Sequence, residues 1–144
     1  MITLELPWPE KKLSPNSRAH WRAKAAYQKQ AHLTGYVTMR KWMEHARIVM
    51  DATVPVTLIF CPPDNRGRDL DNLVASCKHM LDGIADALDY DDRKFRPITA
   101  DWGAVCKPGK VIVTIGRPDT ISAAEAHQRE QEERGQLYYP QRPA

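Results

Sequence analysis

Apolar residues recur at three- and four-residue steps in the middle of the chain. They are Leu70, Leu73, Cys77, Met80, Leu81, Ile84 and Leu88. Because an α-helix turns once in about 3.6 residues, this spacing places them along one side of a helix. The pattern therefore predicts one amphipathic helix whose apolar side faces a core.

Shorter apolar runs predict four strands, over residues 2–6, 54–61, 95–105 and 110–117. Prolines follow the first two of these runs, and a Lys-Pro-Gly turn at 107–109 joins the last two. The proline-free stretch 18–47 predicts a long helix, with Gly35 as the place where it could be interrupted. The order β-α-β-α-β-β predicts an α+β fold in two layers, a mixed sheet with two main helices packed on one face.

A chain of 144 residues, 42% apolar and 27% charged, is typical of one globular domain. We assign residues 1–117 to this domain and 118–144 to a polar tail, with a short helix over 123–134 as the alternative to a mobile segment. The sequence contains neither a long apolar run nor a signal-peptide pattern, so we expect a cytoplasmic protein without a membrane span. Three cysteines without a C-x-x-C motif predict buried, reduced thiols rather than a zinc site.

Charge is spread unevenly, although the net charge is only +3. Residues 1–60 contain nine Lys and Arg against four Asp and Glu, whereas residues 61–117 contain nine of each. A basic N-terminal region beside an acidic centre suits a polyanion that needs both phosphate contacts and metal ions, and equally a solvated surface.

Acidic residues flank the predicted central helix at both ends. Asp69 and Asp71 precede it, where a carboxylate can cap free N–H groups and where the helix dipole favours negative charge. Asp89, Asp91 and Asp92 follow it, where capping cannot explain them. If the chain turns back after Leu88, three or four carboxylates converge and can hold Mg²⁺, or alternatively Mn²⁺.

Lys78 and Asp82 lie on the same side of an ideal helix as Asp71. Helical side chains lean toward the N-terminus, so Lys78 is expected to reach toward the Asp69 and Asp71 end. The competing interpretation is a solvated stripe in which Lys78 and Asp82 form an ion pair one turn apart.

The segment 11–24 combines cations with polar and aromatic side chains. Its candidates for contact with DNA are Asn16, Arg18, His20, Arg22 and Lys24, to which we add Arg66 and Arg68 before the central helix. Trp21 suits base stacking or anchorage of the first helix to the core, and Ser17 suits a helix N-cap.

The run CPPDNRGRDLDNL, together with LPWP near the start and the later Asp-Asp pair, resembles the RusA family of Holliday junction resolvases, which is common in prophages. The resemblance covers roughly residues 2–116, and the segment 13–21 is similar to the LSPN-x-R-x-H-W stretch of phage-type relatives. It implies that Asp69, Asp71 and Asp92 are essential carboxylates that bind the metal, with Asp91 as the alternative to Asp92. In the bacterial prototype a Lys stands where this chain has Ala75, and Lys78 is the nearest substitute, as in phage-type relatives.

The resemblance implies a Mg²⁺-dependent crossover junction endodeoxyribonuclease, active as a homodimer on four-way DNA junctions in recombination and repair, without a small-molecule cofactor. The carboxylates and Lys78 would be its catalytic residues. Two alternatives stay open: a catalytically inactive module that binds branched DNA, and a metal-dependent phosphohydrolase of small substrates. Intact Asp positions favour catalysis, and the basic N-terminal segment favours DNA.

Overall fold

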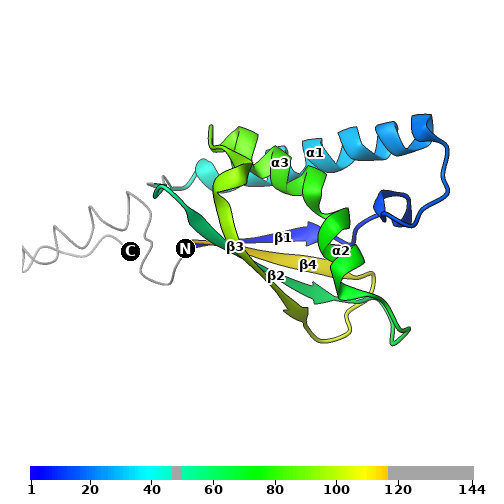
Figure 1. Ribbon diagram of the computed structural model, residues 1–144. Coiled ribbons are helices and arrows are strands. Elements are labelled where there is room, and N and C mark those ends of the chain that lie inside the picture. The colour runs from blue at the N-terminus through cyan, green and yellow to red at the C-terminus, as the bar shows by residue number, and fades with distance from the viewer. Residues whose placement is uncertain (47–49, 117–144) are drawn as a thin grey trace, which may run out of the picture.

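A computed structural model describes residues 1–46 and 50–116, which form two layers (Figure 1). The chain order is β1 (Ile2–Pro7), η1 (Lys11–Leu13), α1 (Trp21–Met43), β2 (Val54–Cys61), α2 (Leu70–Ser76), α3 (Lys78–Ala87), η2 (Asp92–Lys94), β3 (Phe95–Trp102) and β4 (Lys110–Ile115), where η marks a 3₁₀-helix. The predicted tail, with its helix over 123–134, lies outside the described residues. The predicted α+β class, with the helices on one side of a mixed sheet, is confirmed.

The sheet has the strand order β1-β4-β2-β3. β4 pairs antiparallel with both β1 and β2, whereas β3 pairs parallel with β2 at the edge. The sequence suggested that the turn at 107–109 simply joins two consecutive strands, but β3 and β4 lie on opposite sides of β2. The connection crosses the end of β2, where Gly103 N donates to Phe60 O at 2.8 Å and Cys106 N donates to Pro62 O at 2.8 Å.

Alternating residues of β1, β2 and β4 face the helices and form the core. Buried positions alternate with half-exposed ones along β2 and β4, and with exposed ones along β1. The largest fully buried side chains are Phe60, Ile2, Met39, Leu58, Ile84 and Ile115, from both layers. This two-residue period is what one buried sheet face requires.

The single central helix predicted from the periodicity is wrong, because Cys77 separates α2 from α3. Ser76 is buried, and its Oγ donates to Asn72 O at 2.8 Å, a side-chain hydrogen bond that bends helices. A new helix then begins, with Leu81 N donating to Cys77 O at 3.0 Å. Cys77 fits the apolar period on either side of the break, so the period could not reveal it.

The first helix begins later than predicted, at Trp21, and Gly35 does not interrupt it. Its buried residues are Ala31, Gly35 and Met39, whereas Val37 is exposed. Gly35 is instead a packing residue, because a Cβ there would collide with the carbonyl oxygen of Met80 on α3.

Gly83 is the counterpart of Gly35 on α3. A Cβ at this position would collide with the carbonyl oxygen of His32 and approach Tyr36 N at 2.9 Å, both on α1. Each helix thus has a glycine where the other backbone passes, so the two helices can pack in close contact.

One further expectation differs in detail. Of the three cysteines, Cys61 and Cys77 are buried as predicted, but Cys106 is exposed. Burial raises the pKa of the Cys77 thiol to about 12, which keeps it protonated and unreactive.

Among the helices of the described residues, none combines the length and apolar character needed to cross a membrane.

We predict that Gly83→Ala destabilises the fold by at least about 1–3 kcal/mol, the usual cost of overpacking, because the rigid backbone of α1 blocks the added methyl group. In an unobstructed helix the same change would stabilise the fold by about 1 kcal/mol. The sign of the change in unfolding free energy therefore distinguishes a blocked position from an open one. Chemical denaturation measures the free energy of unfolding. Gly67→Ala is the matched control, since no atom lies within 4 Å of its Cβ, and an equal loss there would contradict the packing argument.

Candidate functional site

The loop between β2 and α2 is organised by one carboxylate. Asp64 Oδ1 accepts a hydrogen bond from Arg66 N at 3.0 Å and forms an ion pair with Arg68 at 2.8 Å. The backbone hydrogen bond from Arg66, and next the contact with Arg68, hold the pKa of Asp64 below its usual range. Asp64 thus holds Arg66 and Arg68, two of the four arginines that were predicted to contact DNA.

Asp69 and Asp71 stand at the start of α2, as the sequence predicted. Asp69 occupies the N-cap position, but its side chain makes no capping hydrogen bond, so capping does not explain this carboxylate. Its Oδ2 instead accepts a hydrogen bond from Asn72 Nδ2 at 3.4 Å. Asp71 lies exposed in the first turn.

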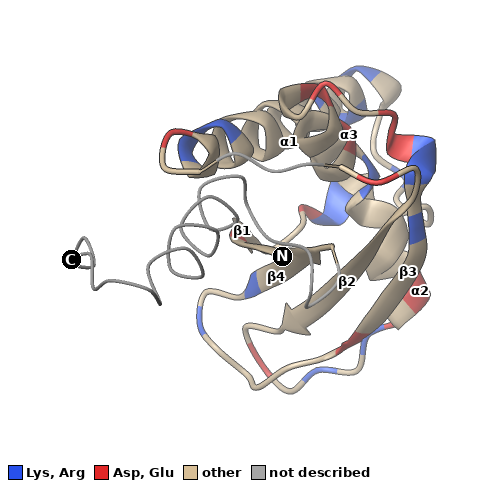
Figure 2. Cartoon of the chain, turned by 90° about the vertical axis from the view of Figure 1, so that its left-hand side faces the viewer, with Lys and Arg blue, Asp and Glu red and all other residues tan. Residues whose placement is uncertain are grey.

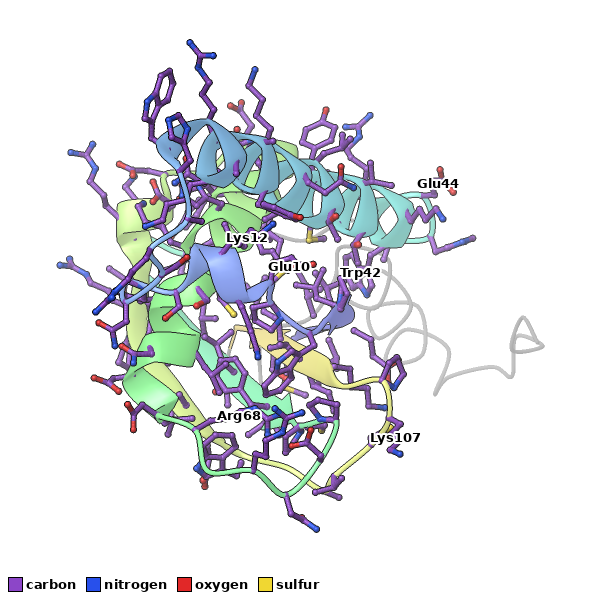
Figure 3. The ribbon with its side chains drawn as sticks, turned by 90° about the vertical axis from the view of Figure 1, so that its right-hand side faces the viewer. Glu10, Lys12, Trp42, Glu44, Arg68 and Lys107 are labelled. Carbon is purple, nitrogen blue, oxygen red and sulfur yellow. The ribbon has the colours of Figure 1, made fainter. Side chains whose placement is uncertain are left out.

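A pocket of about 660 Å³ opens beside Asp69, and we call it the α2 pocket. It lies between the segment around η1 and the loop that leads into α2; in Figure 3, Glu10 of the first and Arg68 of the second are labelled. Its lining includes Trp8, Glu10, Lys11, Ser14, Asn16, Ser17, Pro63, Asp64, Arg66, Arg68, Asp69, Asn72, Leu73 and Ser76. The pocket therefore brings Asn16, Arg66, Arg68 and Asp69 together, four of the residues predicted from the sequence.

The chain turns back after α3 and places Asp92 beside the beginning of that helix. Asp89 takes a left-handed conformation (φ 51°) at this turn, and η2 follows. Lys78 Nζ, in the first turn of α3, lies 3.3 Å from Asp82 Oδ1 and 3.8 Å from Asp92 Oδ2. Figure 2 shows acidic and basic residues close to one another where the chain passes from α3 to β3.

Asp82 joins this group, which we call the Lys78 cluster (Lys78, Asp82 and Asp92). Desolvation is the main reason why the pKa of Asp82 is raised, and a hydrogen bond with Asp92 adds to it, whereas Lys78 acts in the opposite direction. The predicted Lys78–Asp82 ion pair is thus present, with Asp92 as a further neighbour. Sequence reasoning gave Asp82 only this ion pair and no part in catalysis or metal binding.

Asp91 has a separate role from Asp92. Its carboxylate accepts hydrogen bonds from Arg93 N at 3.0 Å, Arg93 Nε at 3.1 Å and Arg93 Nη2 at 3.0 Å. The side-chain hydrogen bond from Arg93 is the main reason why the pKa of Asp91 is lowered. Asp91 therefore caps η2, and of the Asp pair it is Asp92 that lies at Lys78.

The two acidic regions remain separate clusters. Asp69 lies at the α2 pocket, whereas Asp92 lies in the Lys78 cluster. Over residues 1–46 and 50–116, no three His, Cys, Asp or Glu side chains are grouped closely enough to hold a metal ion. Convergence of Asp69, Asp71 and Asp92 therefore stays a prediction. Their donor chemistry fits Mg²⁺, since all are hard carboxylate oxygens at the start of a helix or 3₁₀-turn and not buried.

The basic segment before α1 is arranged differently from the prediction. His20, not Ser17, caps α1, because its Nδ1 accepts from Arg22 N at 3.2 Å. Trp21 is 67% exposed, so it does not anchor the helix to the core, and the Arg22 guanidinium lies 5.2 Å from its ring centre. Arg18, Arg22 and Lys24 belong to this surface and do not line the α2 pocket.

Comparison with known proteins identifies a relative of this chain. No family model matches the sequence. An uncharacterized protein of Xylella fastidiosa (strain Temecula1) is 39% identical over 119 residues, which cover 80% of this chain and 76% of the relative. The chain belongs to the same family as this uncharacterized protein.

The raised pKa of Asp82 gives a stability prediction. A carboxyl group whose pKa is higher in the folded state stabilises the fold below its unfolded value of 3.8, and this contribution is lost as the pH rises through the folded pKa. Asp82→Asn, which stays neutral, should therefore be more stable than the parent at neutral pH and equal to it below pH 3.8. Urea denaturation at several pH values measures the difference.

Asp51→Asn removes the same charge from an exposed position outside the Lys78 cluster and serves as the control. If the gain in unfolding free energy of Asp82→Asn over the parent did not grow from acid to neutral pH, the desolvation of this carboxyl would be contradicted.

Proposed function

We propose that this chain is a Mg²⁺-dependent endonuclease that cuts branched DNA, such as a four-way junction, and acts as a homodimer in the cytoplasm. The observation that carries the proposal is the contact between Lys78 and Asp92, whose Nζ and Oδ2 atoms lie 3.8 Å apart. Both residues were selected through the resemblance to RusA resolvases, and they come from different elements, α3 and η2. Their approach supports a common role.

The carboxylates Asp69, Asp71 and Asp92 would hold the metal. Mg²⁺ bound there would supply Lewis-acid chemistry, activating water and stabilising the leaving oxygen of a phosphodiester. Asp82 holds the lysine: its two oxygens lie 3.3 and 3.4 Å from Lys78 Nζ. Lys78 is thereby kept beside Asp92, where its charge can offset negative charge on a nearby phosphate.

Basic side chains on two surfaces, and the His20 imidazole, would bind the DNA backbone. Arg66 and Arg68 lie in the loop before α2, close in sequence to Asp69, and Asp64 holds both. Arg18, His20, Arg22 and Lys24 lie around the start of α1. Contacts from both surfaces would position a phosphodiester without reading its sequence.

A homodimer suits this substrate because a four-way junction has approximate two-fold symmetry and two strands must be cut. The three free cysteines suit a reducing compartment such as the cytoplasm.

The direct test is incubation of the purified protein with a labelled four-way junction and a linear duplex of the same sequence, in Mg²⁺ or in EDTA. We expect cleavage of the junction in Mg²⁺ alone, because clustered carboxylates repel a phosphodiester until a cation offsets their charge. An inactive binding module would bind the junction and cut it in neither buffer. Equal cleavage in EDTA would exclude the metal mechanism.

We predict that Asp71→Asn abolishes junction cleavage while preserving or tightening junction binding. Asn keeps the size of the side chain, so α2 should form, but it removes the charge that attracts the metal and repels phosphate. Cleavage is followed on gels and binding in EDTA by fluorescence anisotropy.

Asp89→Asn is the matched control for this variant. It removes one exposed carboxylate from the turn before Asp92, at a left-handed position that Asn tolerates. Parent-like cleavage by Asp71→Asn, or equal loss in the control, would remove Asp71 from the site.

We predict that Lys78→Ala slows cleavage by roughly tenfold or more, equivalent to about 1.4 kcal/mol, with little change in stability or junction binding. A lysine in the first turn of a helix opposes the helix dipole, so alanine should cost the fold little. Single-turnover rates measure the effect. Lys29→Ala, an exposed lysine of α1, is the control. A cleavage rate within about twofold of the parent's would mean that Lys78 forms ion pairs but takes no part in catalysis.

A further inference from the structure

The α2 pocket has the size and the lining of a ligand site. Its volume of about 660 Å³ lies within the range of about 300–1,000 Å³ in which small organic molecules bind. Trp8, Pro63 and Leu73 supply apolar walls, and Asn16 and Asn72 supply amide groups. Apolar walls combined with a small number of placed polar groups are typical of sites that bind small organic molecules.

The charges at the pocket largely compensate one another. Arg66 Nε lies 3.3 Å from Asp64 Oδ2, and Arg68 Nη2 lies 2.8 Å from Asp64 Oδ1. Glu10 and Asp69 are further acids in the lining, against Lys11 as a further base. Since the lining contains three acids and three bases, it does not favour a bare anion. It suits a neutral group whose edge offers both donors and acceptors.

One wall is held in place before any ligand arrives. The Trp8 ring meets Phe60 edge-on, with ring centres 6.0 Å apart and an angle of 82°. The Arg68 guanidinium lies 5.4 Å from the Trp8 ring centre. Because Asp64 already holds Arg68, little side-chain entropy is lost from this wall when a ligand binds.

We propose that the α2 pocket receives one unstacked nucleobase of the DNA substrate. This inference rests on the proposed nuclease function and adds how branched DNA is distinguished from linear duplex. An asparagine amide presents a donor and an acceptor side by side, which matches the edge of a base. In a duplex that edge is paired and the faces are stacked, whereas a base beside a crossover leaves the stack at lower cost.

The place of the pocket links base binding to the position of the cut. Asp69 lines the pocket and accepts a hydrogen bond from Asn72 Nδ2 at 3.4 Å. A nucleotide whose base enters the pocket therefore has its own phosphate close to the carboxylate at the start of α2. The asparagines would thus act as specificity-determining residues, and occupancy of the pocket would fix which phosphodiester lies at Asp69.

The first experiment titrates the full chain with each deoxynucleoside 5′-monophosphate, with deoxyribose 5-phosphate as the baseless control. NMR signals of the Trp8 indole N–H and of the Asn16 and Asn72 side-chain amides report on the pocket, and the Asn65 amide, in the same loop region but outside the lining, serves as the internal control. We expect shifts of the pocket signals with the nucleotides alone. Equal shifts with deoxyribose 5-phosphate would mean a phosphate site and would overturn the proposal, as would an absence of shifts at millimolar nucleotide.

The second experiment measures junction affinity in EDTA by anisotropy, with the nucleotides beside the crossover either intact or abasic. The hydrogen bonds that Asn16 and Asn72 make to a base should let the parent prefer the intact junction by at least about fivefold. Asn16→Ala combined with Asn72→Ala should bind both junctions alike, while Asn65→Ala should keep the parent's preference. A parent with no preference, or a double variant that keeps it, contradicts the pocket assignment.

The two proposals fail in different ways. Junction cleavage in Mg²⁺ without any preference for the intact junction would retain the nuclease and reject the base pocket. A protein that neither binds nor cuts junctions would reject the nuclease, and the nucleotide titration would then decide the pocket by itself.

Discussion

Close packing of α1 against α3 is the constraint on which the candidate site depends. Gly35 and Gly83 let each helix backbone approach the other, and any side chain there would meet a carbonyl oxygen. Since α3 begins at Lys78, the packing also fixes where Lys78 stands relative to the sheet. The turn at Asp89 then needs only a few residues to bring Asp92 back to it.

The break at Cys77 follows from the same constraint. α3 is bound to α1, while α2 continues from the loop that β2 delivers and contacts η1 and β3. We infer that one straight helix could not both pack against α1 and make the contacts of α2 with η1 and β3. Ser76 and Cys77 are instead a buried junction between two helices. Asp69 and Asp71 therefore belong to one helix and Lys78 to another, and their relative position depends on the angle at Cys77 and not on a continuous helical wheel.

Much of the fold could be predicted because local patterns determine it. The bounds of β2 follow from an apolar, β-branched run that ends at Pro62, and they agree with the structure. The position of β4 between β1 and β2 could not be predicted, since it depends on pairing between distant segments. The break at Cys77 was also hidden, because a small apolar residue suits a continuous helix and a helix junction equally.

The same division applies to the site. The resemblance selected Asp92 and Lys78, whose Oδ2 and Nζ atoms lie 3.8 Å apart, whereas the alternative Asp91 contacts Arg93. The pocket was not foreseen, because its walls come from the η1 region, the loop before α2 and α2 itself. Trp8, Ser14, Asn16 and Ser17, which line the pocket, show no spacing in the sequence that marks them as parts of one site.

Electrostatics separates the carboxylates of this region into two kinds. Asp64 and Asp91 each receive hydrogen bonds from a nearby arginine and a backbone N–H, and the pKa of each is lowered. They are satisfied within the protein and serve to hold Arg68 and Arg93. Asp82 is the opposite case, because desolvation and the neighbouring Asp92 carboxyl raise its pKa even though Lys78 is close. A further cation beside Asp82 and Asp92 would lower the pKa of Asp82, because a nearby positive charge favours the ionised carboxylate.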